Sequence, residues 1–129
     1  MYLGVRTDSP LAEFYLYKAS SLVREKTWQA DRQLAHGLLA QLESFLAASD
    51  MTFANLEGLF LYSGPGSFTG LRIGITAMNT MAYALDIPIV GAEGEDWRAR
   101  AVTRLIGGET DRLVLPHYGA EARITKPKK

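Results

Sequence analysis

Residues 62–77, YSGPGSFTGLRIGITA, place glycines beside proline, serine and threonine, between an apolar run and a helix-like stretch. A glycine-rich turn between a strand and a helix can cradle a phosphate on backbone amides, or expose a nucleophilic serine. The same residue types also build tight bends that only position their neighbours. The spacing between the residues of the turn distinguishes these roles. The turn consists of Gly64, Pro65, Gly66, Ser67, Phe68, Thr69 and Gly70.

The spacing excludes a P-loop. That motif needs two glycines five residues apart, followed by Lys and then Ser or Thr, because the ammonium reaches the outer phosphates while the hydroxyl meets magnesium. Here Thr69 stands five residues after Gly64. The sequence also contains no lysine between Lys26 and Lys126.

Two other catalytic or binding turns fit no better. A dinucleotide fingerprint has glycines at its first, third and sixth positions, and the sixth position counted from Gly64 is Thr69. A nucleophile elbow is Gly-x-Ser-x-Gly, whereas Ser67 directly follows Gly66. We therefore favour a structural turn whose glycines allow positive φ angles and close backbone approach, with Ser67 or Thr69 capping the next helix. Anion binding at the helix start is the alternative.

Composition narrows the remaining chemistry. The 129 residues include no cysteine, which excludes disulfides, thiolate zinc sites, iron–sulfur ligation and a cysteine nucleophile. The two histidines, His36 and His117, are far apart in the sequence. A hydrophobic share of 47% and a charged share of 22% are typical of a soluble globular domain, so we expect residues 1–129 to form one domain.

Charge is distributed unevenly. Acids outnumber bases in residues 28–97, whereas bases outnumber acids in residues 98–129. We expect residues 117–129 to form a basic, extended tail that stays solvated or touches a nucleic acid or an acidic partner. No stretch is long enough to cross a bilayer and the N-terminus lacks a signal pattern, so we expect no membrane contact and a cytoplasmic location.

Hydrophobic periodicity predicts an α/β fold with a mixed sheet, in which an antiparallel meander precedes strand-helix-strand units. The meander comprises strands at 2–6, 12–19 and 21–28. The elements that follow are a helix over 30–48, a strand over 56–63, a helix from Gly70 or Leu71 to Leu85, a strand over 87–90, a helix over 96–106 and a strand over 112–116.

The helix after the glycine turn is unusually apolar. Its polar face is narrow and consists of Arg72, Thr76, Asn79 and Tyr83. A helix that lies on a sheet with water behind it should have a wide polar face. This helix is therefore predicted to be covered on two sides, with a partner protein or a second copy as the outer cover.

The sequence also resembles a known family. The string SGPGSFTGLRIG (63–74), followed by DIPIVG (86–91), is similar to the signature of the TsaB (YeaZ) family. The similarity extends through residues 34–61, where the family has a Leu-rich helix, a loop and the strand leading to the signature. VRTDSP (5–10) corresponds to the family's first strand, which typically ends in Asp-Thr-Ser.

The resemblance implies an actin/Hsp70-like (ribonuclease H-like) fold, in a shortened form with one lobe where family members have two. It implies a non-catalytic scaffold that binds TsaD, the enzyme of tRNA threonylcarbamoylation, with TsaE joining through the complex and tRNA contacted indirectly. It implies neither a cofactor nor a metal. Arg6 replaces the family's Asp, and a guanidinium cannot bind magnesium. TsaD-type enzymes carry a His-x-x-x-His pair, but Ala40 stands four residues after His36.

The resemblance further implies that TsaD docks on the two helices, or that a second copy docks on the same helices as a homodimer. The expected interface residues are Leu38, Gln41, Leu42 and Phe45 from the first helix and Arg72, Ile75, Met78, Asn79 and Ala82 from the second. Two alternatives from other classes remain, a small nucleotide-binding ATPase and a self-associating structural module.

Overall fold

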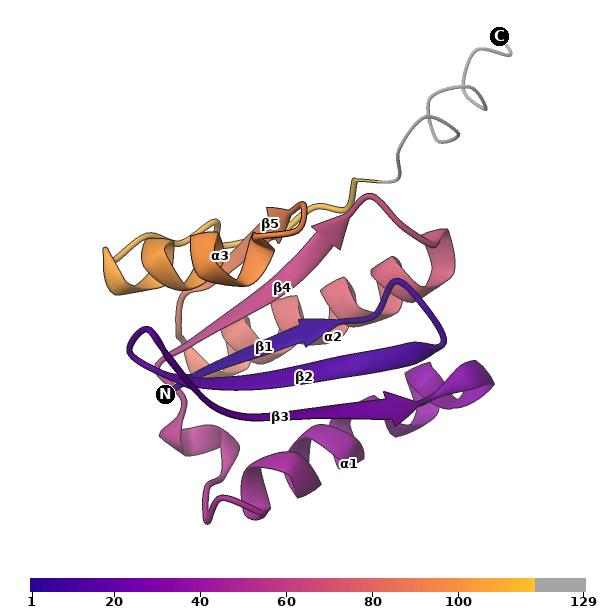
Figure 1. The fold of residues 1–129 in the computed structure, drawn as a ribbon, viewed down its shortest axis with the longest axis horizontal. Coiled ribbons are helices and arrows are strands. Elements are labelled where there is room, and N and C mark those ends of the chain that lie inside the picture. Colours follow the sequence, from indigo (N-terminus) through magenta and orange to yellow (C-terminus); the bar gives the residue numbers. More distant parts are fainter. Residues whose placement is uncertain (118–129) are drawn as a thin grey trace, which may run out of the picture.

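Five strands form one mixed sheet, and helices pack against both of its faces (Figure 1). This computed structural model describes residues 1–117, without the side chain of Phe68. The strands are β1 (Tyr2–Arg6), β2 (Leu11–Lys18), β3 (Ser21–Gln29), β4 (Gly58–Gly64) and β5 (Ile89–Glu93). Their spatial order is β3-β2-β1-β4-β5.

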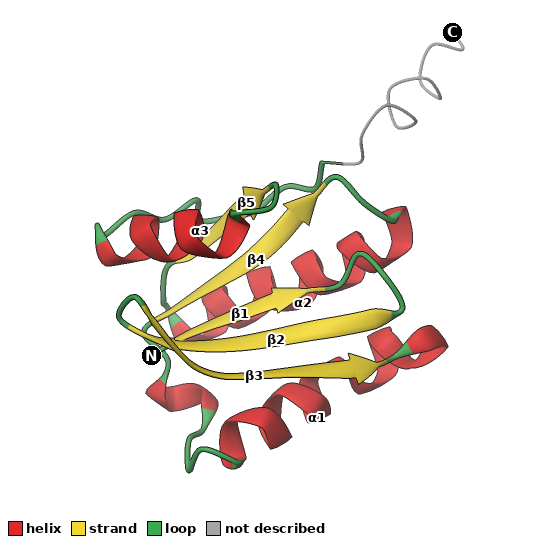
Figure 2. Ribbon diagram, viewed as in Figure 1, coloured by secondary structure: helices red, strands yellow, loops and turns green. Residues whose placement is uncertain are grey.

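The sheet has an antiparallel half and a parallel half, as predicted (Figure 2). β1 pairs antiparallel with β2, and β2 antiparallel with β3, across a tight turn in which Ala19 has a φ of 52°. β4 lies parallel to both β1 and β5. Parallel neighbours need a crossover connection, and a helix supplies it between β4 and β5.

The helices are α1 (Leu34–Ala47), α2 (Phe68–Leu85) and α3 (Trp97–Ile106). Adjacent residues of β2 show that α1 and α3 lie on opposite faces, because successive side chains of a strand point to opposite sides. The ring of Phe14 lies 5.8 Å from that of Phe45 in α1, whereas the ring of Tyr15 lies 5.9 Å from that of Trp97 in α3. α2 lies on the same side of the sheet as α1 (Figure 1).

The apolar residues of α1 follow the three- and four-residue spacing of an amphipathic helix, and they are buried. They are Leu34, Leu38, Leu42, Phe45 and Leu46. In α2 the corresponding buried residues are Leu71, Ile75, Met78, Met81 and Ala82. Both helices thus pack their apolar side chains against the chain's own sheet and against each other.

Several predicted elements differ from the structure. β4 spans Gly58–Gly64 rather than 56–63, and β5 spans Ile89–Glu93 rather than 87–90. A short 3-10 turn over Asp31–Gln33 precedes α1, which begins at Leu34 rather than residue 30. α2 begins at Phe68, two residues before the predicted start. Residues 112–116 form no strand. The backbone of Val114 in that segment bonds to the side chain of Asn79 instead of to a neighbouring strand.

Of the predicted tail at 117–129, only His117 falls within the described part of the chain. Its backbone N–H donates to the carbonyl of Ser63 at 2.8 Å, and its Nδ1 lies 2.9 Å from Glu93 Oε2. The remainder, 118–129, lies outside the described residues. Within residues 1–117, no helix has both the length and the apolar character needed to cross a membrane.

Candidate functional site

The glycine turn connects β4 to α2. Gly64 has a φ of +130°, and a Cβ atom there would stand 2.0 Å from the carbonyl oxygen of His117. Both observations confirm that the turn needs glycine for its backbone conformation and for close approach. Ser67 occupies the N-cap position of α2, as one of the two predicted alternatives, but its side chain makes no capping hydrogen bond. Thr69 lies within the helix.

Three further glycines of the signature bring α2 against the loop between β1 and β2. A Cβ atom on Gly66 would lie 2.5 Å from Asp8 Cβ, and one on Gly70 would lie 2.1 Å from the carbonyl oxygen of Thr7. A Cβ atom on Gly74 would lie 2.2 Å from Thr7 Oγ1. That hydroxyl donates to the Gly70 carbonyl at 2.8 Å. The three glycines therefore allow the turn and α2 to pack closely on the loop between β1 and β2.

The end of β1 places charge beside the same turn. Arg6 Nε and Nη2 donate to the two Asp8 carboxylate oxygens at 2.7 and 3.1 Å. The Arg6 guanidinium also lies 3.8 Å from the centre of the Tyr62 ring, and the Tyr62 hydroxyl donates to the Pro65 carbonyl at 2.7 Å. The carboxylate beside Gly66 is therefore already paired with a guanidinium.

Two pKa values in this cluster shift for identifiable reasons. The hydrogen bond to Asp8 raises the pKa of Arg6, although partial burial of the guanidinium opposes the shift. Burial raises the pKa of Tyr62, and the nearby Arg6 charge only partly offsets it. Arg6 therefore stays charged and Tyr62 neutral at physiological pH. Among residues 1–117, no three His, Asp or Glu side chains gather in the way a metal site requires.

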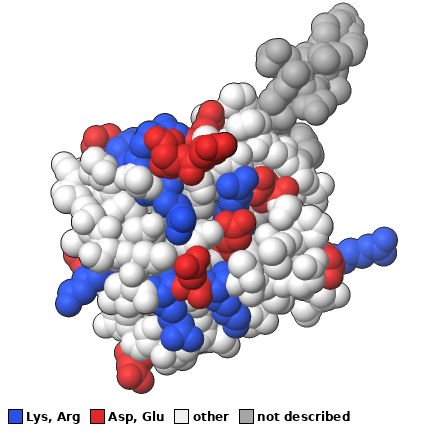
Figure 3. Space-filling model, in the orientation of Figure 1, with Lys and Arg blue, Asp and Glu red and all other residues white. Residues whose placement is uncertain are grey.

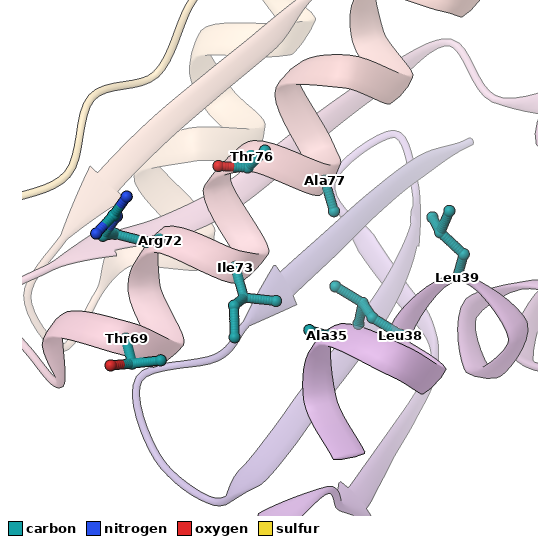
Figure 4. Close-up of a pocket in the computed structure, with 8 residues that line it drawn as sticks. All are labelled: Ala35, Leu38, Leu39, Thr69, Arg72, Ile73, Thr76 and Ala77. Carbon is teal, nitrogen blue, oxygen red and sulfur yellow. The ribbon is translucent and has the colours of Figure 1, made fainter. Parts of the chain in front are cut away.

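A second feature is an open groove between α1 and α2, with a volume of about 420 Å³ (Figure 4). Figure 4 shows Ala35 and Leu38 on α1 and Ile73 on α2 pointing toward one another across it. The lining is mainly apolar and comprises Ala35, Leu38, Leu39, Thr69, Arg72, Ile73, Thr76 and Ala77. Leu39 is 55% exposed. The groove is thus an apolar surface open to solvent.

Most of the predicted interface residues are buried in the chain's own core, and of these only Leu38 also lines the groove. Six of them are no more than 4% exposed, because their side chains pack within the chain's own core; they are Leu38, Leu42, Phe45, Ile75, Met78 and Ala82. Asn79 uses its amide to bond both backbone groups of Val114. Gln41 is half-buried, and Arg72 is exposed and lines the groove. Docking on the helix pair stays a prediction, but burial argues against most of the face assigned to it.

Sequence reasoning missed the exposed and half-buried apolar residues that line the groove. Leu39 directly follows the core residue Leu38, so it lies outside the buried stripe of α1. Ile73 and Ala77 flank the buried stripe of α2 in the same way. These residues could have been found as apolar residues that fall outside the three- and four-residue spacing of the buried positions. Such residues are not buried in the core, so they are free to line a surface.

The strand order, the mixed pairing and the helices on both faces define this chain as an α/β domain of the actin-like class. Residues 28–103 match the family model described as TsaD: tRNA N6-adenosine threonylcarbamoyltransferase. The chain is 35% identical, over 90% of its length, to tRNA threonylcarbamoyladenosine biosynthesis protein TsaB of Bacillus subtilis. It therefore belongs to the TsaB (YeaZ) family.

Other relatives agree with this assignment. The TsaB protein of Escherichia coli is 29% identical over 64% of the chain. The solved structure of YeaZ from Pseudomonas aeruginosa superposes with a TM-score of 0.64 over 71% of the chain, at 23% identity, which supports the fold. The matched part covers 43% of the B. subtilis protein, 38% of the E. coli protein and 43% of the YeaZ chain. The chain thus spans less than half the length of these relatives.

Proposed function

We propose that this chain is a non-catalytic subunit that binds TsaD and thereby supports threonylcarbamoylation of the adenosine beside the anticodon of tRNA. The observation that carries the proposal is the open apolar groove between α1 and α2. Membership of the TsaB family is the reason for proposing TsaD as the partner and tRNA threonylcarbamoylation as the pathway. Within this proposal TsaE joins through the complex, tRNA is contacted indirectly and the subunit acts in the cytoplasm.

The groove has the character of a helix-binding surface. Two antiparallel or crossed helices with small residues between them leave room for the ridge of a third helix. Ala35 and Ala77 are small, while Leu39 and Ile73 offer apolar side chains at the rim. An apolar helix face from TsaD would cover these side chains, and a stable interface of this kind buries about 1,600 Å² in total.

The contacts at the glycine turn support a subunit without catalysis. Gly66, Gly70 and Gly74 lie so close to Thr7 and Asp8 that no ligand group fits between these residues, and the hollow of about 380 Å³ beside them is lined in part by Thr7 and Gly70 themselves. Arg6 occupies the end of β1 and is paired with Asp8, so the carboxylate is already satisfied. These contacts favour the scaffold over the alternative of a small ATPase.

The charge distribution supports an indirect contact with tRNA. On the described part of the face seen in Figure 3, acidic and basic side chains lie interspersed rather than in a broad field of one sign. Strong binding to a phosphate backbone usually depends on a positive surface. The proposal therefore leaves tRNA recognition to the partner.

Leu39→Glu tests the proposed surface. Leu39 is exposed, so the variant should fold, but its carboxylate would be buried without a partner in the complex. We expect affinity for TsaD from the same cell to fall at least about tenfold, as is usual for a residue central to an interface. Purified mixtures would be analysed by size exclusion with light scattering and by titration calorimetry.

Ala40→Glu is the matched control, because Ala40 is exposed on α1 but does not line the groove. It should bind TsaD as the unmodified chain does. Equal binding by Leu39→Glu would show that the groove is not the docking surface. A chain that forms Leu39-dependent dimers yet never binds TsaD at micromolar concentration would instead support the self-associating module.

A further inference from the structure

Residues 110–117, called the strap below, run along the outer edge of β5 after α3. The backbone N–H of Asp111 donates to the Ile89 carbonyl at 2.7 Å, and the backbone N–H of His117 donates to the Ser63 carbonyl at 2.8 Å. The sequence predicted a strand here, but the strap forms no regular ladder. It is a separate segment that bonds to the edge strand β5 at Ile89 and to the inner strand β4 at Ser63.

The strap and Arg104 satisfy the outward-facing backbone groups of β5. The Ile89 N–H donates to Thr110 Oγ1 at 3.1 Å, and the Gly91 N–H donates to Asp111 Oδ2 at 2.9 Å. Arg104 Nη1 donates to the Gly91 carbonyl at 3.2 Å, while the Ile89 carbonyl accepts from Asp111. An additional strand cannot pair with β5 while these groups are occupied. An open edge of this kind is otherwise a ready template for strand addition.

Few apolar contacts hold the strap. Val114 is 4% exposed and packs beside Gly91, whereas Leu113 and Leu115 are 61% and 71% exposed. Opening the strap would therefore expose little apolar surface to water, apart from the Val114 side chain. Segments with little buried apolar area open at a lower free energy than the strands they cover.

Polar contacts provide the remaining attachment. Asn79 in α2 donates from Nδ2 to the Val114 carbonyl at 3.0 Å and accepts from the Val114 N–H at 2.9 Å. Arg104 in α3 forms an ion pair with Asp111 and another with Glu109. The anchors thus come from helices on opposite faces of the sheet, and Arg104 joins the strap directly to the β5 edge.

We propose that the strap is a latch on the β5 edge, which opens as a unit while the five-stranded sheet stays folded. When closed, it occupies the hydrogen-bonding groups of Ile89 and Gly91; when open, it leaves them accessible. Arg104 makes the main polar contact that holds the strap closed, because its guanidinium bonds to the Gly91 carbonyl, Asp111 and Glu109. The latch is distinct from the proposed TsaD surface, because no residue of the strap lines the groove between α1 and α2.

Amide hydrogen exchange measured by NMR on the whole chain tests the latch. In the unmodified chain, the Ile89 and Gly91 amides should exchange faster than the amides of β4, which lies inside the sheet. In Arg104→Gln their exchange should rise about tenfold or more, as expected for loss of charged hydrogen bonds, with β4 unchanged. Arg100→Gln is the control, since Arg100 is also on α3 but pairs with Asp96.

A second variant, Val114→Ala, removes the buried apolar anchor without touching Arg104. It should accelerate the same two amides, and it keeps the test decisive if Arg104→Gln fails to fold. The latch is refuted if Ile89 and Gly91 exchange as slowly as β4 and change only together with it. It is also refuted if neither variant alters their exchange.

Discussion

Replacing Gly70 with alanine is expected to lower the free energy of unfolding by about 3 kcal/mol, the upper part of the usual range for overpacking. The new Cβ atom would lie 2.1 Å from the carbonyl oxygen of Thr7, a backbone atom that cannot rotate away. Thr7 is itself buried, at 3% exposure. The better helix propensity of alanine, about 1 kcal/mol, offsets only part of this cost. Urea denaturation followed by circular dichroism would measure the change.

Gly107→Ala is the matched control for this substitution. A Cβ atom there would meet its nearest neighbours at 3.5 Å, an ordinary contact, and Gly107 has a φ of −75°. Its stability should be unchanged or slightly increased, since alanine restricts the unfolded chain. If Gly70→Ala were as stable as this control, the close packing of α2 on the β1–β2 loop would not matter for stability.

Met78→Glu is expected to leave little or no folded protein. Met78 is 0% exposed in α2, so the carboxylate would be buried in an apolar core without a cationic partner. An uncompensated buried charge costs roughly 3–5 kcal/mol or more, against a total stability of about 5–15 kcal/mol for a domain. Soluble yield and the cooperative thermal transition would report the loss.

Two controls accompany Met78→Glu. Ala84→Glu introduces the same charge at an exposed position of α2 and should fold normally. Met78→Leu keeps the volume and should cost less than about 1.5 kcal/mol. A folded Met78→Glu with a normal transition would contradict the burial of this side chain. The same burial makes Met78 unsuitable for testing a partner surface.

The elements of the fold were predictable because hydrophobic periodicity is a local property. The alternation in β2 and the three- and four-residue spacing in α1 and α2 require only neighbouring residues. What covers an apolar face is not local. The stripe of Leu38, Leu42 and Phe45 had to be buried, but the sequence did not reveal that the chain's own sheet buries it.

The same limit explains the missing strand. In residues 112–116, Val114 is buried between the exposed Leu113 and Leu115, a burial pattern that is typical of a strand. A strand also needs a neighbouring backbone, and here the side chain of Asn79 takes that place. Asn79 precedes Val114 by 35 residues, and nothing in the local pattern marks the two as partners.

The packing role of the glycine turn could be predicted from the sequence, but the residues that it packs against could not. Exclusion of known phosphate and nucleophile motifs left packing as the favoured role, and the contacts of Gly66, Gly70 and Gly74 confirm it. Their partners, Thr7 and Asp8, are about sixty residues away in the sequence, as the 63-residue separation of Thr7 and Gly70 illustrates. Only the folded sheet brings these segments together.

The contact between the β1–β2 loop and α2 also constrains how this protein can evolve. Thr7 meets Gly70 through its carbonyl and Gly74 through its hydroxyl, so no side chain can be added at either glycine without moving the loop. An acceptable substitution at one of these positions would therefore require a compensating change at another. Among descendants of this sequence, positions 7, 70 and 74 would be inherited as a co-varying set, although none of them performs chemistry.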